Sequence, residues 1–122
     1  MILGDTFYSI TNSQVDINQS FTFNVCFHAE DQIFKAHFPN QPIVPGACLV
    51  QISKEMIENI HHKSIRILEF NQLKFLNTIN PNEIPEVDLN IQIKRDENQN
   101  MALIKFQNGS ATYAKFDFIF DE

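Results

Sequence analysis

The chain has 122 residues, a length that fits one domain over residues 1–122 and leaves no room for a second. Its hydrophobic share of 43% is ordinary for a globular domain, so a packed core is expected without a disulfide or a metal to support it. The formal net charge of −6 argues against a nucleic-acid-binding protein and against adhesion to anionic membranes, and no apolar run approaches the roughly 20 residues that cross a bilayer.

The first part of the chain predicts strands. Its N-terminus, Met1 to Asp5, has neither the basic region nor the long apolar core of a signal peptide, so we expect a cytoplasmic location. A weak strand is expected near residues 7–11. From Phe21 to His28 apolar and polar residues alternate, a period of two that indicates a half-buried strand. Cys26 and Cys48 form no C-x-x-C motif and are interpreted as two buried free thiols of a reducing compartment.

A loop and then one long helix follow. Residues 29–45 show no clean period, and three of the five prolines fall at the end of this segment, which predicts a shaped and ordered loop. No glycine or proline interrupts residues 47–62, and a helix is expected there, ending near His61 to Lys63. Its apolar stripe recurs at helical spacing and consists of Leu49, Ile52, Met56 and Ile60, widened by Val50 and Ile57.

The second half of the chain reads almost entirely as strands. They are expected over residues 65–75, 87–94, 101–106 and 115–120, separated by turns at 80–82, 96–100 and the hairpin dipeptide Asn108-Gly109. The predicted order is two strands, a loop, one long helix and about four strands in a meander. This order predicts an α+β domain. In such a domain a curved antiparallel sheet wraps the long helix.

The proline-rich loop contains residues suited to proton chemistry. His37 is the side chain type best able to exchange a proton near neutral pH, and the prolines after it would hold the loop still. Gly46 lies at the entry to the helix, where the first N–H groups have no partner inside the helix and can polarise a carbonyl. His28, His61 and His62 are interpreted as packed or surface residues. The four histidines are not spaced as a metal site, so no metal is expected.

The same loop carries a recognisable motif. It resembles the H-F-P-G-x-P-x-x-P-G motif of the bacterial β-hydroxyacyl-acyl-carrier-protein dehydratases of the FabZ and FabA type. The matching residues stand at fixed spacing and are His37, Phe38, Pro39, Pro42, Pro45 and Gly46, with the remaining positions of the loop filled by Asn40, Gln41, Ile43 and Val44. The resemblance implies the hot-dog fold, in which an antiparallel sheet wraps a long helix.

The resemblance also implies an activity and a set of roles. The family dehydrates 3-hydroxyacyl thioesters carried on acyl carrier protein to trans-2-enoyl thioesters, in fatty-acid or specialised lipid and polyene synthesis. His37 would remove the C2 proton, and the amides of Gly46 and Ala47 would polarise the thioester carbonyl. Phe38 and Pro45 would complete the substrate-binding site. The family uses no cofactor and works as a homodimer, often assembled further as a trimer of dimers.

Two positions depart from the family pattern. Asn40 replaces the first glycine of the motif, and asparagine tolerates left-handed backbone conformations better than most residues. Gln51 stands at the position of the family's acid, and Glu55 stands one helical turn later, where many members carry glutamine. Because residues i and i+4 share a helix face, Glu55 is predicted to supply the acid and Gln51 to orient the substrate. Glu58 is a weaker candidate for the acid.

Two other functions compete with dehydration. The loss of the acid at position 51 is also typical of a catalytically weak subunit that binds acyl chains or pairs with an active homologue. An acyl thioesterase on the same scaffold would need a carboxylate to activate water, and Glu55 is the nearby candidate. The expected partner is an acidic acyl carrier protein, and its predicted docking cations are Lys35, Lys63 and Arg66.

Overall fold

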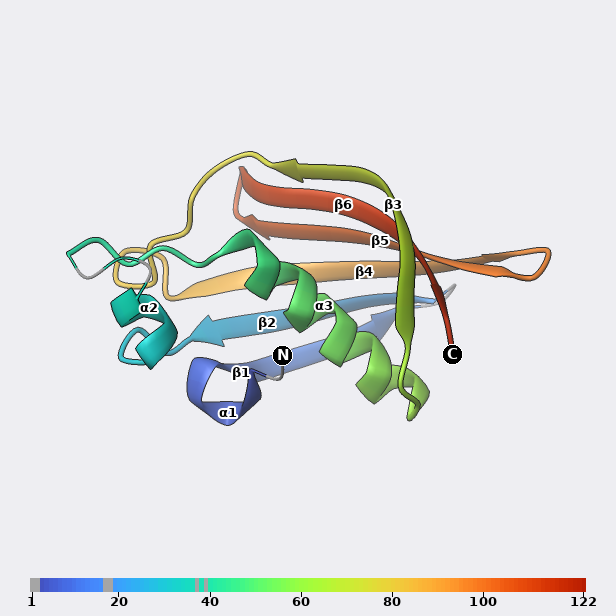
Figure 1. The fold of residues 1–122 in the computed structure, drawn as a ribbon, viewed down its shortest axis with the longest axis horizontal. Helices are drawn as coiled ribbons and strands as arrows, with labels where there is room; N and C mark the ends of the chain where they lie inside the picture. Colours follow the sequence, from blue (N-terminus) through green and yellow to red (C-terminus); the bar gives the residue numbers. More distant parts are fainter. Residues whose placement is uncertain (1–2, 17–18, 37, 39) are drawn as a thin grey trace.

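The structure is a computed structural model that describes residues 3–16, 19–36, 38 and 40–122. Among these residues six strands form one antiparallel sheet in the order β1-β2-β4-β5-β6-β3. The predicted α+β class is confirmed, and the sheet curls around one long helix, α3 (Figure 1). The elements are α1 (Gly4–Phe7), β1 (Tyr8–Asp16), β2 (Ser20–Phe27), α2 (Gln32–Ala36), α3 (Gly46–His61), β3 (Arg66–Phe75), β4 (Glu86–Asp96), β5 (Gln99–Asn108) and β6 (Ala111–Asp121).

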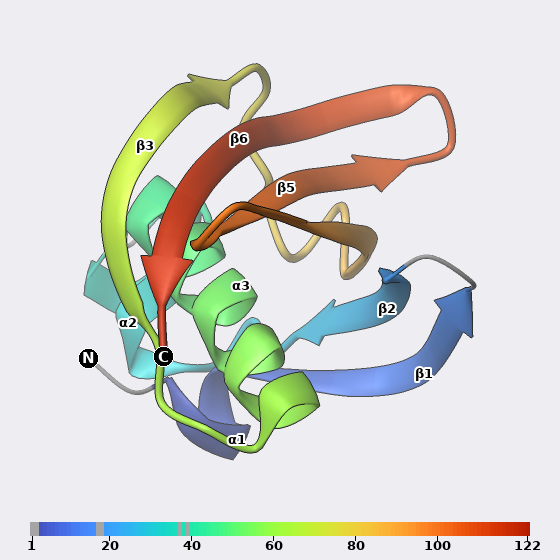
Figure 2. The same ribbon diagram turned by 90° about the vertical axis from the view of Figure 1, so that its right-hand side faces the viewer.

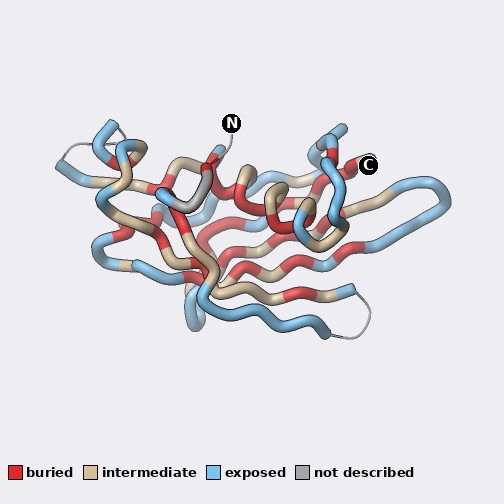
Figure 3. Tube along the Cα trace, turned by 90° about the horizontal axis from the view of Figure 1, so that it is seen from below, coloured by how far each residue is buried: buried red, intermediate tan, exposed pale blue. Residues whose placement is uncertain are grey.

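Helix α3 lies in the hollow of the curved sheet (Figure 2). Its apolar stripe is buried as predicted, with Ile52 and Ile57 fully enclosed. The sheet supplies the other side of the core with inward-facing phenylalanines of β5 and β6, and Phe106, Phe116 and Phe118 are 0% exposed. Each such side chain stabilises the fold by about 1.5–3 kcal/mol relative to an exposed one. Figure 3 shows the buried residues gathered between helix and sheet, whereas the far half of β1 is exposed.

The predicted four-strand meander is wrong for one strand. Strands β4, β5 and β6 do follow one another through tight turns, and Gly109 adopts the positive φ of 60° that the second of these turns requires. Strand β3, however, lies at the edge of the sheet beside β6. The chain leaves α3 along that edge, and residues 76–85 then carry it back across the end of the sheet to β4 (Figure 1). A connection of that length is not a hairpin, so sequential strands need not pair.

Two short helices were not predicted. Helix α2 lies inside the segment expected to be an irregular loop, and the Asp31 carboxylate accepts the Ile33 N–H at 2.9 Å at its start. Phe34 of α2 is buried and stacks on Phe7 of α1, with ring centroids 4.8 Å apart. One helical turn is too short to show a 3.6-residue period, so pattern analysis could not detect either helix.

The two cysteines differ in burial. Cys48 is buried in α3, but Cys26 is only half-buried, so the prediction of two buried thiols is wrong for Cys26. Cys26 lies on β2, where alternate side chains face away from the helix and towards solvent. None of the helices in the described ranges is both long and apolar enough to span a bilayer.

Candidate functional site

The motif loop leads into the N-terminal end of α3. His37 and Pro39 lie outside the described residues. The described part of the loop turns at Phe38, whose carbonyl accepts the Gln41 N–H at 3.2 Å, and the Phe38 side chain is 56% exposed. Further on, the Val44 N–H donates to the Ile79 carbonyl at 2.9 Å, which ties the loop to the segment between β3 and β4. The loop is therefore anchored next to the start of the helix.

The start of α3 offers free backbone donors. Pro45 precedes the helix in an extended conformation, and no side chain among the described residues caps it. The N–H groups of Cys48 and Leu49 donate to the Pro45 carbonyl at 2.9 and 3.4 Å. The N–H groups of Gly46 and Ala47 come before this turn and point out of the helix, as the first N–H groups of any helix do. They are suited to polarising a carbonyl oxygen.

An apolar cavity of about 420 Å³ opens beside these donors. It is lined by Ile43, Val44, Pro45, Gly46, Ala47, Leu49, Phe75, Asn77, Thr78 and Ile79. The Phe75 ring lies so close to Gly46 that a Cβ on this residue would come within 2.8 Å of the ring. A side chain at position 46 would therefore require the ring to move, and Phe75 is a lining residue that the sequence analysis missed.

Glu55 is the centre of a half-buried hydrogen-bond cluster on α3. Its Oε1 accepts the Tyr8 hydroxyl at 2.7 Å. Its Oε2 accepts the Leu3 N–H at 3.2 Å and the Gln51 amide at 2.9 Å. The two residues that exchange places relative to the family pattern thus contact each other directly. Tyr8 and Leu3 were missed because 47 and 52 residues separate them from Glu55, and no local pattern indicates such a contact.

The other candidate acid is already engaged. The Glu58 carboxylate accepts the Ile65 N–H at 2.9 Å and so holds the chain where it leaves α3. Between Gly46 and Glu55 lies Cys48, whose thiol pKa is raised to about 11 by burial first and then by the charges of Asp31 and Glu55. Burial outweighs the usual lowering of a thiol pKa near a helix N-terminus, so Cys48 is a protonated core residue at neutral pH.

The predicted docking cations do not form one patch. Arg66 is paired with Asp121 at 2.7 Å and Lys63 with Glu122 at 3.5 Å, both beyond the C-terminal end of α3. Lys35 is exposed on α2, beside the motif loop. Two of the three cations are therefore neutralised at the end of the helix that lies farthest from Gly46.

Two of the remaining histidines, His28 and His61, have structural contacts. His61 contacts the Glu122 carboxylate at the end of α3. His28 lies within 3.2 Å of the Thr6 carbonyl through Nδ1 and within 3.1 Å of the Ser9 hydroxyl through Nε2. Because a carbonyl only accepts, Nδ1 carries the proton and Nε2 accepts from Ser9. These bonds join α1 and β1 to the end of β2.

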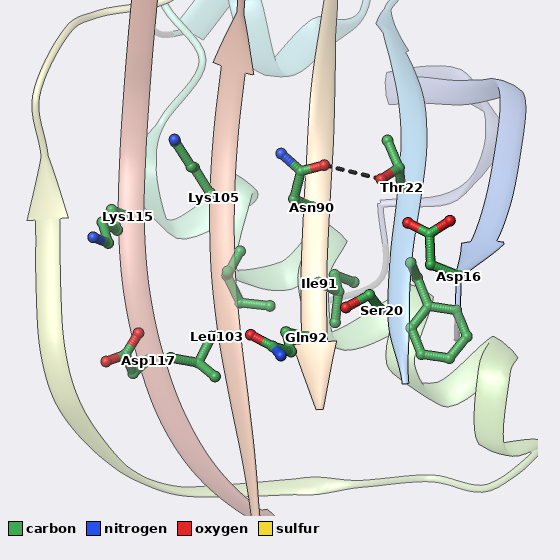
Figure 4. Close-up of a pocket in the computed structure, with 12 residues that line it drawn as sticks. Asp16, Ser20, Thr22, Asn90, Ile91, Gln92, Leu103, Lys105, Lys115 and Asp117 are labelled. Carbon is green, nitrogen blue, oxygen red and sulfur yellow. Dashed lines mark hydrogen bonds between the residues drawn. The ribbon is translucent and has the colours of Figure 1, made fainter. Parts of the chain in front are cut away.

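A second concavity, of about 430 Å³, lies on the outer face of the sheet (Figure 4). Its lining includes Lys105, Lys115 and Asp117, and Thr22 donates to the Asn90 side chain at 3.0 Å across two neighbouring strands. It contains none of the residues that the sequence analysis selected. The apolar cavity at Gly46 is the candidate active site because the motif residues Pro45 and Gly46 line it.

Comparisons with known proteins concern the family and the fold of this chain. A family model described as ApeI-like, ApeI dehydratase, matches residues 13–116. Two curated relatives named 3-hydroxyacyl-[acyl-carrier-protein] dehydratase FabZ, from the Gardel and Welgevonden strains of Ehrlichia ruminantium, are each 27% identical over 97 residues. The match covers 72% of this chain and 63% of each relative, so the chain spans less than two thirds of their length.

Solved structures show the same fold. The dehydratase heterocomplex ApeI:P from Xenorhabdus doucetiae aligns with a TM-score of 0.70 at 14% identity, over 94% of this chain and 98% of the other. An uncharacterized protein from Erwinia carotovora subsp. atroseptica aligns with a TM-score of 0.63 at 12% identity, over 94% of both chains. The predicted hot-dog fold is confirmed. Because the family model runs from β1 to β6, the chain belongs to the ApeI-like dehydratase family.

Proposed function

We propose that this protein dehydrates a 3-hydroxyacyl thioester, carried on an acyl carrier protein, to the trans-2-enoyl thioester. The observation that carries the proposal is the uncapped start of α3 at Gly46, which faces an apolar cavity beside the motif loop. An acyl chain needs an apolar cavity, and a thioester carbonyl needs fixed donors where negative charge develops on its oxygen. Membership of a dehydratase family supports elimination rather than hydrolysis.

The proposed reaction assigns one role to each group. His37 takes the C2 proton, and the electron pair of that C–H bond forms the C2=C3 double bond. The C3–O bond breaks, the carboxylic acid of Glu55 gives its proton to the departing oxygen, and water leaves. The N–H groups of Gly46 and Ala47 stabilise the charge that develops on the thioester oxygen. The role of His37 rests on the motif, and no cofactor enters any step.

Geometry along α3 favours a site shared between two subunits. Gly46 and Glu55 are nine positions apart, which is about 13 Å along a helix that rises 1.5 Å per residue. In the substrate, the C1 carbonyl and the C3 hydroxyl are carried by carbons only two bonds apart. Gly46 and Glu55 of one helix therefore lie too far apart to contact the C1 carbonyl and the C3 hydroxyl of one substrate. We propose that Glu55 acts on a substrate held at the Gly46 end of a second subunit.

The edge strand β3 is the proposed contact between subunits. It pairs with β6 on one side only, and an unpaired strand edge is a template for pairing with another chain. Five of the seven large apolar side chains exposed in the described part of the chain lie on or just after it: Leu68, Phe70, Leu73, Phe75 and Leu76. A homodimer about a two-fold axis, with α3 close to the interface, would cover them.

The assembly has a direct test. Light scattering of the purified protein should give the mass of a dimer, and Leu73→Asp should give a monomer. Val15→Asp is the matched control, because Val15 is a 72% exposed apolar residue on β1, the other edge strand. A wild-type protein that is monomeric at micromolar concentration would contradict the shared site.

A second candidate function is a partner subunit without activity of its own. Gln51 favours it, because this amide cannot donate a proton as the family's acid does. The similar structure from Xenorhabdus doucetiae is a dehydratase heterocomplex, which makes a mixed assembly a reasonable alternative for this chain. In that case Gln51 and Glu55 would belong to the interface rather than to the chemistry.

The activity test uses four variants of the purified protein. Incubation with a 3-hydroxyacyl carrier-protein thioester should yield the enoyl product, detected as the loss of one water by mass spectrometry. His37→Ala should lower turnover by about two to four orders of magnitude. Glu55→Gln should nearly abolish it, while Glu58→Gln, the same change one turn along α3, should not.

The fourth variant separates the two functions. Gln51→Glu restores the family's acid and should preserve or raise the activity of an enzyme that already works. If the wild-type protein is inactive and Gln51→Glu becomes active, the partner-subunit function is correct and Glu55 is not the acid.

A further inference from the structure

We propose that Tyr8 is a positioning residue for the acid Glu55: its hydroxyl holds Oε1 and stabilises the carboxylate that Glu55 becomes after giving up its proton. This inference rests on the proposed function, because it concerns the acid of that reaction. Its starting point is the 2.7 Å hydrogen bond from Tyr8 to Glu55.

The three donors around Glu55 are not equivalent. Oε2 accepts from the Gln51 amide and from the Leu3 backbone N–H, and a backbone N–H can only donate. Oε1 accepts from the Tyr8 hydroxyl alone among these three groups, and a hydroxyl can both donate and accept. When Glu55 carries a proton, Oε1 is therefore the favoured site for it, since the Tyr8 hydroxyl can turn round and remain bonded.

This arrangement favours proton release over proton retention. In the acid form Tyr8 bonds a neutral group, whereas after release it donates to an ionised carboxylate, and hydrogen bonds to charged groups are roughly twice as strong. The bond strengthens as the proton passes from Oε1 to the departing hydroxyl. An interaction that grows along the reaction coordinate raises kcat rather than tightening substrate binding.

The position of Tyr8 suits this role. The side chain is only 7% exposed, and β1 holds it in place because Tyr8 pairs with Phe27 of β2. Glu55 itself is half-buried, so it remains open to a substrate on one side. Burial of the hydroxyl end lowers the local dielectric and strengthens the bond to the carboxylate.

The variant Tyr8→Phe tests the inference, because it removes the hydroxyl and keeps the buried ring. Tyr113→Phe is the matched control: Tyr113 is the other of the two tyrosines and is also 7% exposed. The first measurement is circular dichroism, which should give the wild-type spectrum for both variants and so show that the fold is kept.

The second measurement is turnover of the carrier-bound substrate. Tyr8→Phe should lower kcat about ten- to hundredfold with little change in KM, as expected for one hydrogen bond to a charged group. In the Glu55→Gln background the same change should have no further effect, because Tyr8 acts through Glu55. Tyr113→Phe should keep wild-type kcat.

The outcomes distinguish the inference from the proposed function. An active protein in which Tyr8→Phe retains the wild-type kcat overturns the inference alone. A loss of kcat in Tyr8→Phe that persists in the Glu55→Gln background also overturns it, because the effect then does not pass through Glu55. A wild-type protein without dehydratase activity overturns the proposed function and, with it, this role of Tyr8.

Discussion

At its N-terminal end α3 begins at Gly46 without a side-chain cap among the described residues, whereas its C-terminal end is closed by several contacts. There the left-handed His62 directs its N–H to the Glu58 carbonyl, and the Glu58 carboxylate accepts the Ile65 N–H. His61 and Lys63 both contact Glu122, and Lys63 places a cationic group at the negative end of the helix dipole.

The difference between the two ends separates stability from function. A helix end stabilises the fold when its backbone groups find partners in the protein. Backbone N–H donors that face a cavity have no partner in the protein and do not add this stabilisation. They remain available to bind a ligand. Changes near Gly46 are therefore expected to alter activity, and changes near Glu58 are expected to alter the free energy of unfolding.

Of the two helix ends, the larger effect on activity is expected at Gly46. The methyl group of Gly46→Ala would come within 2.8 Å of the Phe75 ring and displace either the ring or the substrate. We expect kcat/KM to fall about 10²-fold, the usual result of misplacing a reacting group by 1 Å. The free energy of unfolding should change by less than about 1 kcal/mol, since alanine favours helices.

The matched experiment makes the same change in a Phe75→Ala background. If the contact with Phe75 is the cause, Gly46→Ala should then have a much smaller effect on kcat/KM. An equal loss in both backgrounds would show that the methyl group acts on the substrate directly.

At the other end of the helix, Glu58→Ala should lower stability without changing activity. It removes the acceptor of the Ile65 N–H, which is bonded at 2.9 Å, and a hydrogen bond to a charged group contributes about 1.5–3 kcal/mol. Urea unfolding measures the loss, and Glu58→Gln, which keeps an acceptor oxygen, should lose less. A drop in kcat with unchanged stability would instead place Glu58 in the chemistry.

A smaller effect separates the two cysteines. The pKa of Cys48 is raised to about 11, so at pH 8 only about 0.1% of this thiol is ionised and reactive. Iodoacetamide should modify the half-buried Cys26 and leave Cys48 intact, as judged by peptide mass. Rapid modification of Cys48 in the native protein would show that the N-terminal end of α3 opens.

The smallest effect is expected at the C-terminus. The hydrogen bond from His61, aided by the charges of His61 and Lys63, lowers the pKa of Glu122. A lowered folded-state pKa means that the stabilisation is present above the unfolded-state pKa and is lost as pH falls through the folded-state value. Glu122→Gln should therefore lower Tm slightly at pH 7 and not at strongly acidic pH, a difference that calorimetry can measure.

Local patterns predicted the long elements and the motif. Helix α3 and the four strands after it were located from the spacing of apolar residues, because burial on one side of a helix or strand leaves that period in the sequence. The hairpin at Gly109 was likewise predictable, since the turn needs a positive φ. The motif from His37 to Gly46 indicates the fold and the broad family without any tertiary information.

Tertiary structure alone decided which residues meet. Nothing in the sequence brings Tyr8 to Glu55 or Phe75 to Gly46, and nothing places β3 at the outer edge beside β6. Such contacts join residues tens of positions apart, and they depend on how the sheet curls around α3 rather than on any local preference. A periodic pattern in the sequence indicates which face of a helix or strand is buried. Which residue packs against that face depends on the packing of the whole chain.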